Sequence, residues 1–182
     1  MMKKFKAISI GCTFLVVLSA GQVFSQMSLP AHSSIYTGLS RGYWFKAPCN
    51  FTITALRVAP EAGTGLQYIH VMKCTATFPV AFGTPSTAFT TLAYISGATN
   101  NTNVSVNISV TKGDQIGIMG TVTGICNSYA TSAIVTSTIN GLNVNLNRFG
   151  YQGSIEGGAA PNYWGQGDSP AGQIGRIFMY YT

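Results

Sequence analysis

Few side chains in this sequence can act as acids, bases or nucleophiles. The chain has two histidines and four acidic residues, His32, His70, Glu61, Asp114, Glu156 and Asp168. Glycoside hydrolysis uses two carboxyl groups at a set separation, and Glu156 and Asp168 share one glycine-rich segment. Carboxylates in loops are commonly solvated, so a glycan hydrolase is the minor alternative. We predict that the protein is not an enzyme.

The histidines are too scattered to predict a metal site. Zinc needs clustered His and Cys ligands, whereas His32 and His70 lie far apart in the chain. His70 stands in the alternating stretch Leu66–Cys74, which is typical of a histidine packed on a strand. Calcium needs several nearby oxygen ligands, and the stretch Lys112–Asp114 offers one acid. We therefore interpret this stretch as a turn and not as a calcium site. The sequence therefore predicts no catalytic residue, no metal and no cofactor.

A polar, glycine-rich segment carries one of the two tryptophans. A planar ring beside amides and a carboxylate suits stacking against a sugar, with hydrogen bonds to the sugar hydroxyls. We predict a ligand-binding site here, formed by Trp164, Tyr163, Asn162, Gln166 and Asp168. For Trp164 itself the favoured interpretation is that it fills one end of the core, because large aromatic side chains dominate core energetics, and the ligand platform is the second interpretation. For Trp44, inside a predicted strand, we expect the core.

The first residues have the three parts of a secretory signal peptide. A basic start (Lys3, Lys4 and Lys6) precedes an apolar run from Ala7 to Ala20, and small side chains before Gln26 allow cleavage there. The apolar run is shorter than the about 20 residues that span a membrane. We predict a signal peptide over residues 1–25 and a single domain over 26–182, with no membrane span after cleavage. The expected location is extracellular or the cell surface, with the periplasm as an option.

The charges do not favour nucleic acid as a partner. The formal net charge is +6, but three of the ten basic residues lie in the predicted signal peptide. The others are scattered, and phosphate binding needs a clustered basic surface. Only 8% of all residues are charged, so strand edges lack the charges that keep them apart. This composition suits a protein that packs against itself or a surface polymer.

The clearest pair of strands is Phe51–Val58 and Leu66–Cys74, joined by a loop with Pro60 and two glycines. A short loop between adjacent strands predicts an antiparallel hairpin. Folded about its middle, this hairpin places Cys49 opposite Cys74, within disulfide range. Cys126 is then a free or intermolecular thiol, although pairing of Cys74 with Cys126 stays open.

Further short strands follow at regular spacing along the chain. Asn140-Gly141 between apolar runs predicts a type I′ hairpin turn, and Thr111–Asp114 predicts a turn after which Gln115–Met119 pairs back. The segment from Tyr151 to Gly172 is a predicted surface loop. About nine or ten strands and no helix predict an all-β fold, an antiparallel β-sandwich or jelly roll. The other predicted strands are Ala31–Leu39, Arg41–Lys46, Phe89–Ile95, Asn103–Val110, Ala133–Ile139, Leu142–Phe149 and Gln173–Tyr181.

Five segments resemble a group of exported bacterial β-sandwich proteins of unknown function. They are Gly42–Pro48, Phe51–Val58, Gly113–Ile118, Asn127–Tyr129 and Arg148–Gln152, and together they span most of the chain after the signal peptide. The resemblance implies a sandwich fold and export. That group has no assigned catalytic residues, so the resemblance implies none here.

Together these features predict an exported binding or adhesion module at the cell surface, with a glycan or surface polymer as its partner. The alternative is a structural subunit that assembles with itself into a surface layer or extracellular fibre. Low charge and the spare thiol of Cys126 favour that alternative.

Overall fold

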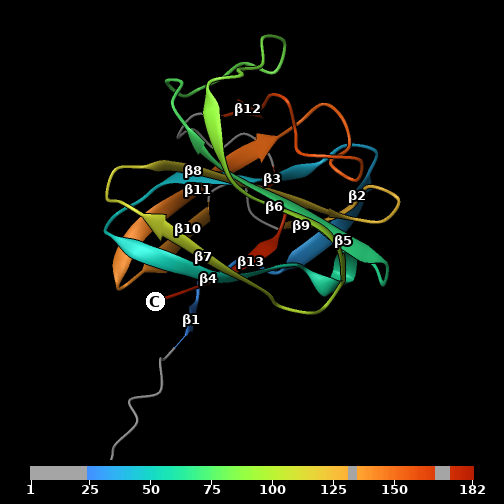
Figure 1. Cartoon of the computed structure of the whole chain (residues 1–182), viewed down its shortest axis with the longest axis horizontal. Helices are drawn as coiled ribbons and strands as arrows, with labels where there is room; N and C mark the ends of the chain where they lie inside the picture. Colours follow the sequence, from blue (N-terminus) through green and yellow to red (C-terminus); the bar gives the residue numbers. More distant parts are fainter. Residues whose placement is uncertain (1–23, 131–134, 167–172) are drawn as a thin grey trace, which may run out of the picture.

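The computed structural model of the chain describes residues 24–130, 135–166 and 173–182. These residues form two antiparallel β-sheets that pack face to face (Figure 1), which confirms the predicted all-β sandwich. The strands are β1 (Ser25–Gln26), β2 (His32–Thr37), β3 (Arg41–Lys46), β4 (Phe51–Val58), β5 (Leu66–Cys74), β6 (Phe89–Thr99), β7 (Val104–Val110), β8 (Gln115–Val122), β9 (Cys126–Ala130), β10 (Val135–Ile139), β11 (Leu142–Gly150), β12 (Trp164–Gly165) and β13 (Ile177–Tyr181).

The larger sheet has nine strands, with the main order β10-β11-β3-β8-β5-β6. Strand β12 pairs with the end of β11, while β9 joins β8 and pairs with β2. Several strands alternate buried and exposed residues, and β10 does so at every position. This period of two is expected where one face of a strand is buried.

The smaller sheet has four strands in the order β1-β13-β4-β7. Strand β1 pairs with β13, so Ser25 lies opposite Tyr181. The chain after β1 turns inward, and the side chain of Met27 is completely buried in the core. The predicted cleavage site before Gln26 therefore falls inside β1, one residue ahead of the buried Met27.

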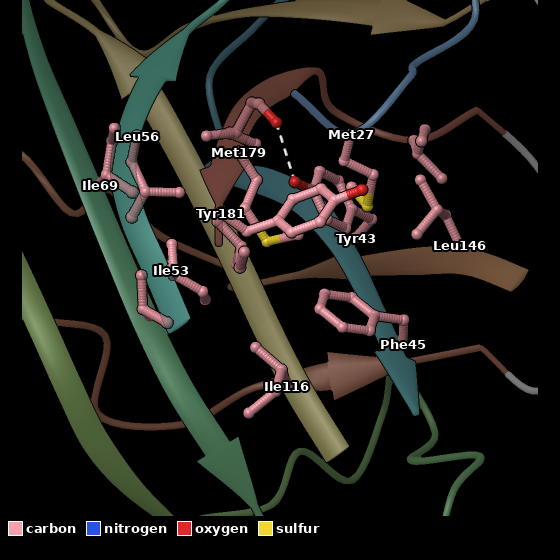
Figure 2. Close-up of a cluster of buried hydrophobic side chains, with 14 of the residues drawn as sticks. Met27, Tyr43, Phe45, Ile53, Leu56, Ile69, Ile116, Leu146, Met179 and Tyr181 are labelled. Atoms are coloured by element: carbon pink, nitrogen blue, oxygen red, sulfur yellow. Dashed lines mark hydrogen bonds between the residues drawn. The ribbon is translucent and has the colours of Figure 1, made fainter. Parts of the chain in front are cut away.

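The main core lies between the two sheets. Figure 2 shows Met27, Met179 and Tyr181 gathered around Tyr43. Tyr43 donates a hydrogen bond from its hydroxyl to the carbonyl oxygen of Ile177 at 2.8 Å, which satisfies a polar group that has no access to solvent. Burial also raises the pKa of Tyr43 well above its usual value.

A second apolar cluster covers the opposite face of the larger sheet. Trp44, Met72 and Phe149 supply its floor from the strands. Residues from two connecting segments, 75–88 and 151–163, cover these side chains. The larger sheet is therefore covered on both faces, and its second face is covered by loops instead of by another sheet.

The predicted hairpin of β4 and β5 is wrong. Strand β4 pairs with β13 and β7, whereas β5 pairs with β6 and β8 in the other sheet. A 3-10 turn over Pro60–Ala62 carries the chain from one sheet to the other. The buried amide of Gln67 accepts a hydrogen bond from the Val58 N–H at 2.8 Å, so a side chain joins the two strands at this corner.

The second predicted pairing, of β7 with β8, is wrong for the same reason. The turn between them exists, and Asp114 N donates to Thr111 O at 3.0 Å. Strand β7, however, belongs to the smaller sheet and β8 to the larger one. Both corrections have one cause, because a short turn permits either a hairpin or a crossing between layers.

The predicted disulfide depended on the first of these hairpins. Since β4 and β5 do not pair, their register does not bring Cys49 and Cys74 together. Cys49, Cys74 and Cys126 are all free thiols in the structure. Cys74 is buried in the second cluster, where burial raises the pKa of its thiol to about 12.

The predicted hairpin at Asn140-Gly141 is confirmed. Strands β10 and β11 pair antiparallel from Ile139↔Leu142 onward. Asn140 has φ of 51° and Gly141 has φ of 76°, and a type I′ turn needs positive φ at both positions. Among the described residues, no helix is long and apolar enough to cross a membrane.

Candidate functional site

A polar groove lies at one side of the second cluster. Its volume is about 370 Å³. It brings together residues from β3, β8, β11 and the segment after β5, which are distant in the sequence. The lining residues are Trp44, Lys46, Thr77, Phe78, Gln115, Asn143, Val144, Asn145 and Asn147.

The strand register explains why these residues share one face. Asn147 of β11 pairs directly with Trp44 of β3, and Lys46 pairs with Gln115 of β8. Directly paired residues point to the same side of a sheet, and so do residues two apart in a strand. The intervening Val144 points the other way, into the main core.

Two stacked rings form the apolar wall of the groove. The rings of Trp44 and Phe78 lie 3.8 Å apart between centroids and 10° from parallel. The indole N–H of Trp44 donates to the carbonyl oxygen of Gln166 at 2.6 Å, which fixes the ring. Gly165 makes room for the stack, because a Cβ there would lie 2.3 Å from Cε1 of Phe78. Trp44 is 5% exposed and Phe78 is half-buried, so Phe78 presents the more accessible ring.

A row of three amides faces this wall. Asn143 and Asn145 are exposed and Asn147 is half-buried. Successive members of the row are about 6.6 Å apart along the strand. Asn145 also accepts a hydrogen bond from the Thr136 hydroxyl of β10 at 3.3 Å, which holds its side chain. An asparagine amide has two donors and an acceptor, so the exposed amides of Asn143 and Asn145 can bind a ligand rich in hydroxyl groups.

Lys46 is the charged residue in the lining. Its side chain is exposed at the end of β3, where its ammonium group provides three donors. The nearest acid in sequence to the groove, Asp114, is held by Lys73 at 2.7 Å between Oδ1 and Nζ. The lining thus combines an aromatic wall, amides, a hydroxyl and one cation. Groups of these kinds can bind and orient a polar ligand.

The sequence-predicted site in the loop is placed differently. Tyr163 has no exposed surface and Trp164 is 2% exposed. Both belong to the second cluster, so neither offers a free ring to a sugar. Asn162 and Gln166 are half-buried beside them, and Asp168 lies outside the described residues. The burial of Trp164 agrees with the favoured interpretation that it fills the core, because the loop folds back over the sheet and buries its aromatic side chains.

Trp164 is held by two guanidinium groups. Those of Arg41 and Arg148 lie 5.1 and 5.3 Å from its ring, and its N–H donates to Gln152 at 3.2 Å. Arg41 is itself 3% exposed and donates to the Tyr151 carbonyl at 2.7 Å. Desolvation lowers the pKa of Arg41 from its usual value. These contacts serve the packing of the loop.

Two of the remaining acid–base candidates, Glu156 and His70, each make a local hydrogen bond. Glu156 accepts a hydrogen bond from the backbone N–H of Ile125 at 2.6 Å, which is the capping role expected of a loop carboxylate. Its predicted partner, Asp168, lies outside the described residues. His70 is buried on β5, as predicted, and its Nε2 lies 2.9 Å from the Thr91 hydroxyl. Within residues 24–130, 135–166 and 173–182, no three His, Cys, Asp or Glu residues are grouped as metal ligands would be.

Sequence reasoning missed the groove, although part of its signal was visible. Asn143, Asn145 and Asn147 alternate with apolar residues after the Asn140-Gly141 turn, so their common face could have been predicted. Phe78 could not, because it lies in a loop whose position no strand pattern specifies. Neither a known protein family nor a curated protein sequence matches this chain.

Proposed function

We propose that the protein is an exported, non-enzymatic module that binds glycan at the cell surface. The observation that carries the proposal is the row of Asn143, Asn145 and Asn147 beside the stacked rings of Trp44 and Phe78. Sugar rings have apolar faces and hydroxyl edges, so an aromatic wall next to amides matches both. The site in this proposal is the groove, and it replaces the loop around Trp164.

The proposal includes export, and the fold limits where the signal peptide can be cleaved. Met27 is completely buried in the core, and its N–H donates to the Met179 carbonyl at 2.9 Å. Cleavage after Met27 would remove that side chain from the fold. We therefore expect the mature protein to begin at Gln26, and N-terminal sequencing of protein recovered outside the cytoplasm tests this.

A glycan array followed by calorimetry tests the binding function. We expect at least one glycan to bind, and we expect Asn145→Ala and Lys46→Ala to weaken that binding about tenfold or more, since each removes a donor that can bind to the ligand. Asn103→Ala is the matched control, because Asn103 is an exposed asparagine that does not line the groove. A protein that binds no glycan on the array, or that binds equally well with Asn145→Ala, is not the module proposed here.

A structural subunit that assembles with itself is the second candidate. Its support is the absence of charge on three edge strands, β6, β7 and β10, whose sequences contain no Asp, Glu, Lys or Arg. Uncharged edges favour pairing between molecules. Light scattering over a wide concentration range distinguishes the candidates, because assembly into a layer or fibre predicts a mass that keeps growing with concentration beyond that of a dimer. A mass that never exceeds that of a dimer would remove this candidate and leave the binding module.

A further inference from the structure

Strand β7 forms an open edge of the smaller sheet. It pairs with β4 on one side, and no described strand pairs with its other side. The edge is seven residues long and its side chains are all uncharged. The opposite edge of the same sheet, β1, is only two residues long. Strand β7 is therefore the edge of this sheet with room for a partner strand.

The sequence of β7 is nearly the same in both directions. VSVNISV becomes VSINVSV when reversed, and it differs only by an exchange of Val and Ile. If two copies of β7 pair antiparallel about Asn107, Val104 lies opposite Val110 and Val106 opposite Ile108. On the outer face, Ser105 lies opposite Ser109, and Asn107 lies opposite its own copy.

Burial along β7 agrees with a missing partner. Ile108 and Val110 are buried, whereas Val104 and Val106 are only half-buried. In the pairing above, each half-buried valine lies next to a buried residue of the other copy. A second copy would continue the apolar inner face, and the valines would lose part of their remaining exposure to water.

The centre of β7 has a bulge, which a two-fold pair can accommodate. The register with β4 shifts between Ile53 and Ala55, opposite the stretch of β7 that contains Val106 and Asn107. A bulge bends and twists its strand. Because this bend lies at the centre of the near-symmetric sequence, a two-fold axis through Asn107 places the two bends side by side.

We propose that β7 is an isologous interface through which two copies of this chain pair antiparallel, joining their smaller sheets into one. Such an interface uses the same patch on both molecules and closes after two copies. The pairing stands independently of glycan binding and does not use the groove residues. It also differs from fibre assembly, which requires a second interface.

Charge reversal at Asn107 tests the pairing and its register. Sedimentation of the purified protein is expected to show a monomer–dimer equilibrium. Asn107→Lys and Asn107→Glu each place like charges opposite one another only in the dimer. We expect each variant alone to weaken the dimer about tenfold or more, and we expect an equal mixture of the two to restore it.

Thr138→Lys is the control, because it adds the same charge to an exposed position on another edge strand, β10, and should leave the dimer unchanged. Circular dichroism and thermal unfolding verify that each variant is folded. A monomer at all concentrations, a dimer indifferent to Asn107→Lys, or two variants that do not recover on mixing would each overturn the proposal.

Discussion

Nδ1 of His70 accepts a hydrogen bond from the backbone N–H of Ala160 at 3.1 Å, so one imidazole joins strand β5 to the segment that covers the second cluster. The other nitrogen, Nε2, lies 2.9 Å from the hydroxyl of Thr91. Since Nδ1 accepts, the proton of the neutral ring is on Nε2. Protonation would place a second proton on Nδ1 and remove the acceptor that Ala160 uses.

This arrangement predicts a loss of stability in mild acid. Burial lowers the pKa of His70 from 6.5 to about 4. Between these values the unfolded chain binds the proton and the folded chain does not, so acid favours unfolding. His70 does not reduce the free energy of unfolding above about pH 6.5. As the pH falls from there towards 4, its titration lowers the free energy of unfolding by roughly 3 kcal/mol.

Urea unfolding at several pH values measures this effect. Other groups also titrate, so the relevant quantity is the difference between the wild type and His70→Gln, which has no imidazole at this position. We expect the wild type to lose more stability than the variant between pH 7 and pH 4.5. Parallel pH profiles for the two proteins would contradict the prediction.

Gly165 is predicted to be intolerant of a side chain. It lies below the Trp44–Phe78 stack, and a Cβ would meet Cε1 of Phe78 at 2.3 Å and Cδ1 of Trp44 at 3.1 Å. Gly165→Ala must displace Phe78, and overpacking of this kind typically costs about 1–3 kcal/mol. Because Phe78 lines the groove, the proposed glycan binding should weaken as the free energy of unfolding falls.

Gly157→Ala is the matched control for this substitution. Gly157 lies in the segment over the same cluster, and a Cβ there would meet nothing within 4 Å. Its free energy of unfolding should stay within about 0.5 kcal/mol of the wild type. Thermal unfolding of both variants makes the comparison, and equal stability of the two would contradict the close packing at Gly165.

Gln67 is predicted to be the polar residue whose loss costs most at the corner between the sheets. It is completely buried, accepts from Val58 N, and donates to the carbonyls of Thr99 and Thr102 at 2.9 and 2.7 Å. Gln67→Leu would remove the partner of three backbone groups, at about 2–4 kcal/mol in total.

Gln173→Leu provides the comparison for that variant, because the amide of Gln173 makes an exposed hydrogen bond to Ser33 at 2.9 Å. Its effect should be below about 1 kcal/mol. The midpoints of denaturant unfolding, compared at an unchanged m value, give the change in the free energy of unfolding for both variants. If Gln67→Leu were no more destabilising than the control, the corner would depend on something other than this amide.

The sequence predicted the strands better than their partners. Alternation placed β3, β4, β5 and β7 within a residue of their observed bounds, because alternation reports local burial. The two pairing errors, β4 with β5 and β7 with β8, arose because a turn of suitable length serves a hairpin and a layer crossing equally well. The Asn140-Gly141 hairpin was predictable, because its turn type itself specifies adjacent strands.

The candidate site was harder to predict than the fold. Trp164 stands in a polar segment, so the sequence left a ligand platform open beside the favoured interpretation that it fills the core. The structure buries it because Arg41 and Gln152 supply partners from other parts of the chain. The groove depends on Phe78 reaching Trp44 from a loop, a contact between residues 34 positions apart in the sequence. Such contacts follow from tertiary packing, which periodicity does not encode.

The three cysteines of the described residues, Cys49, Cys74 and Cys126, provide the last prediction. All are free in the structure, and Cys74 is buried with a thiol pKa raised to about 12, whereas Cys49 and Cys126 are half-buried. The thiolate is the reactive form, so Cys74 should resist alkylation at pH 8 until the protein unfolds. Cys49 and Cys126 should react faster, because reagent can reach them in the folded state.

Alkylation of the folded protein with iodoacetamide, followed by peptide mass mapping, measures each cysteine separately. A second sample alkylated in denaturant without reductant is the control, since it should label all three positions equally. Disulfide-linked peptides containing Cys49 and Cys74 would contradict the observed strand arrangement. They would require β4 and β5 to approach each other at their ends, which their membership of different sheets does not provide.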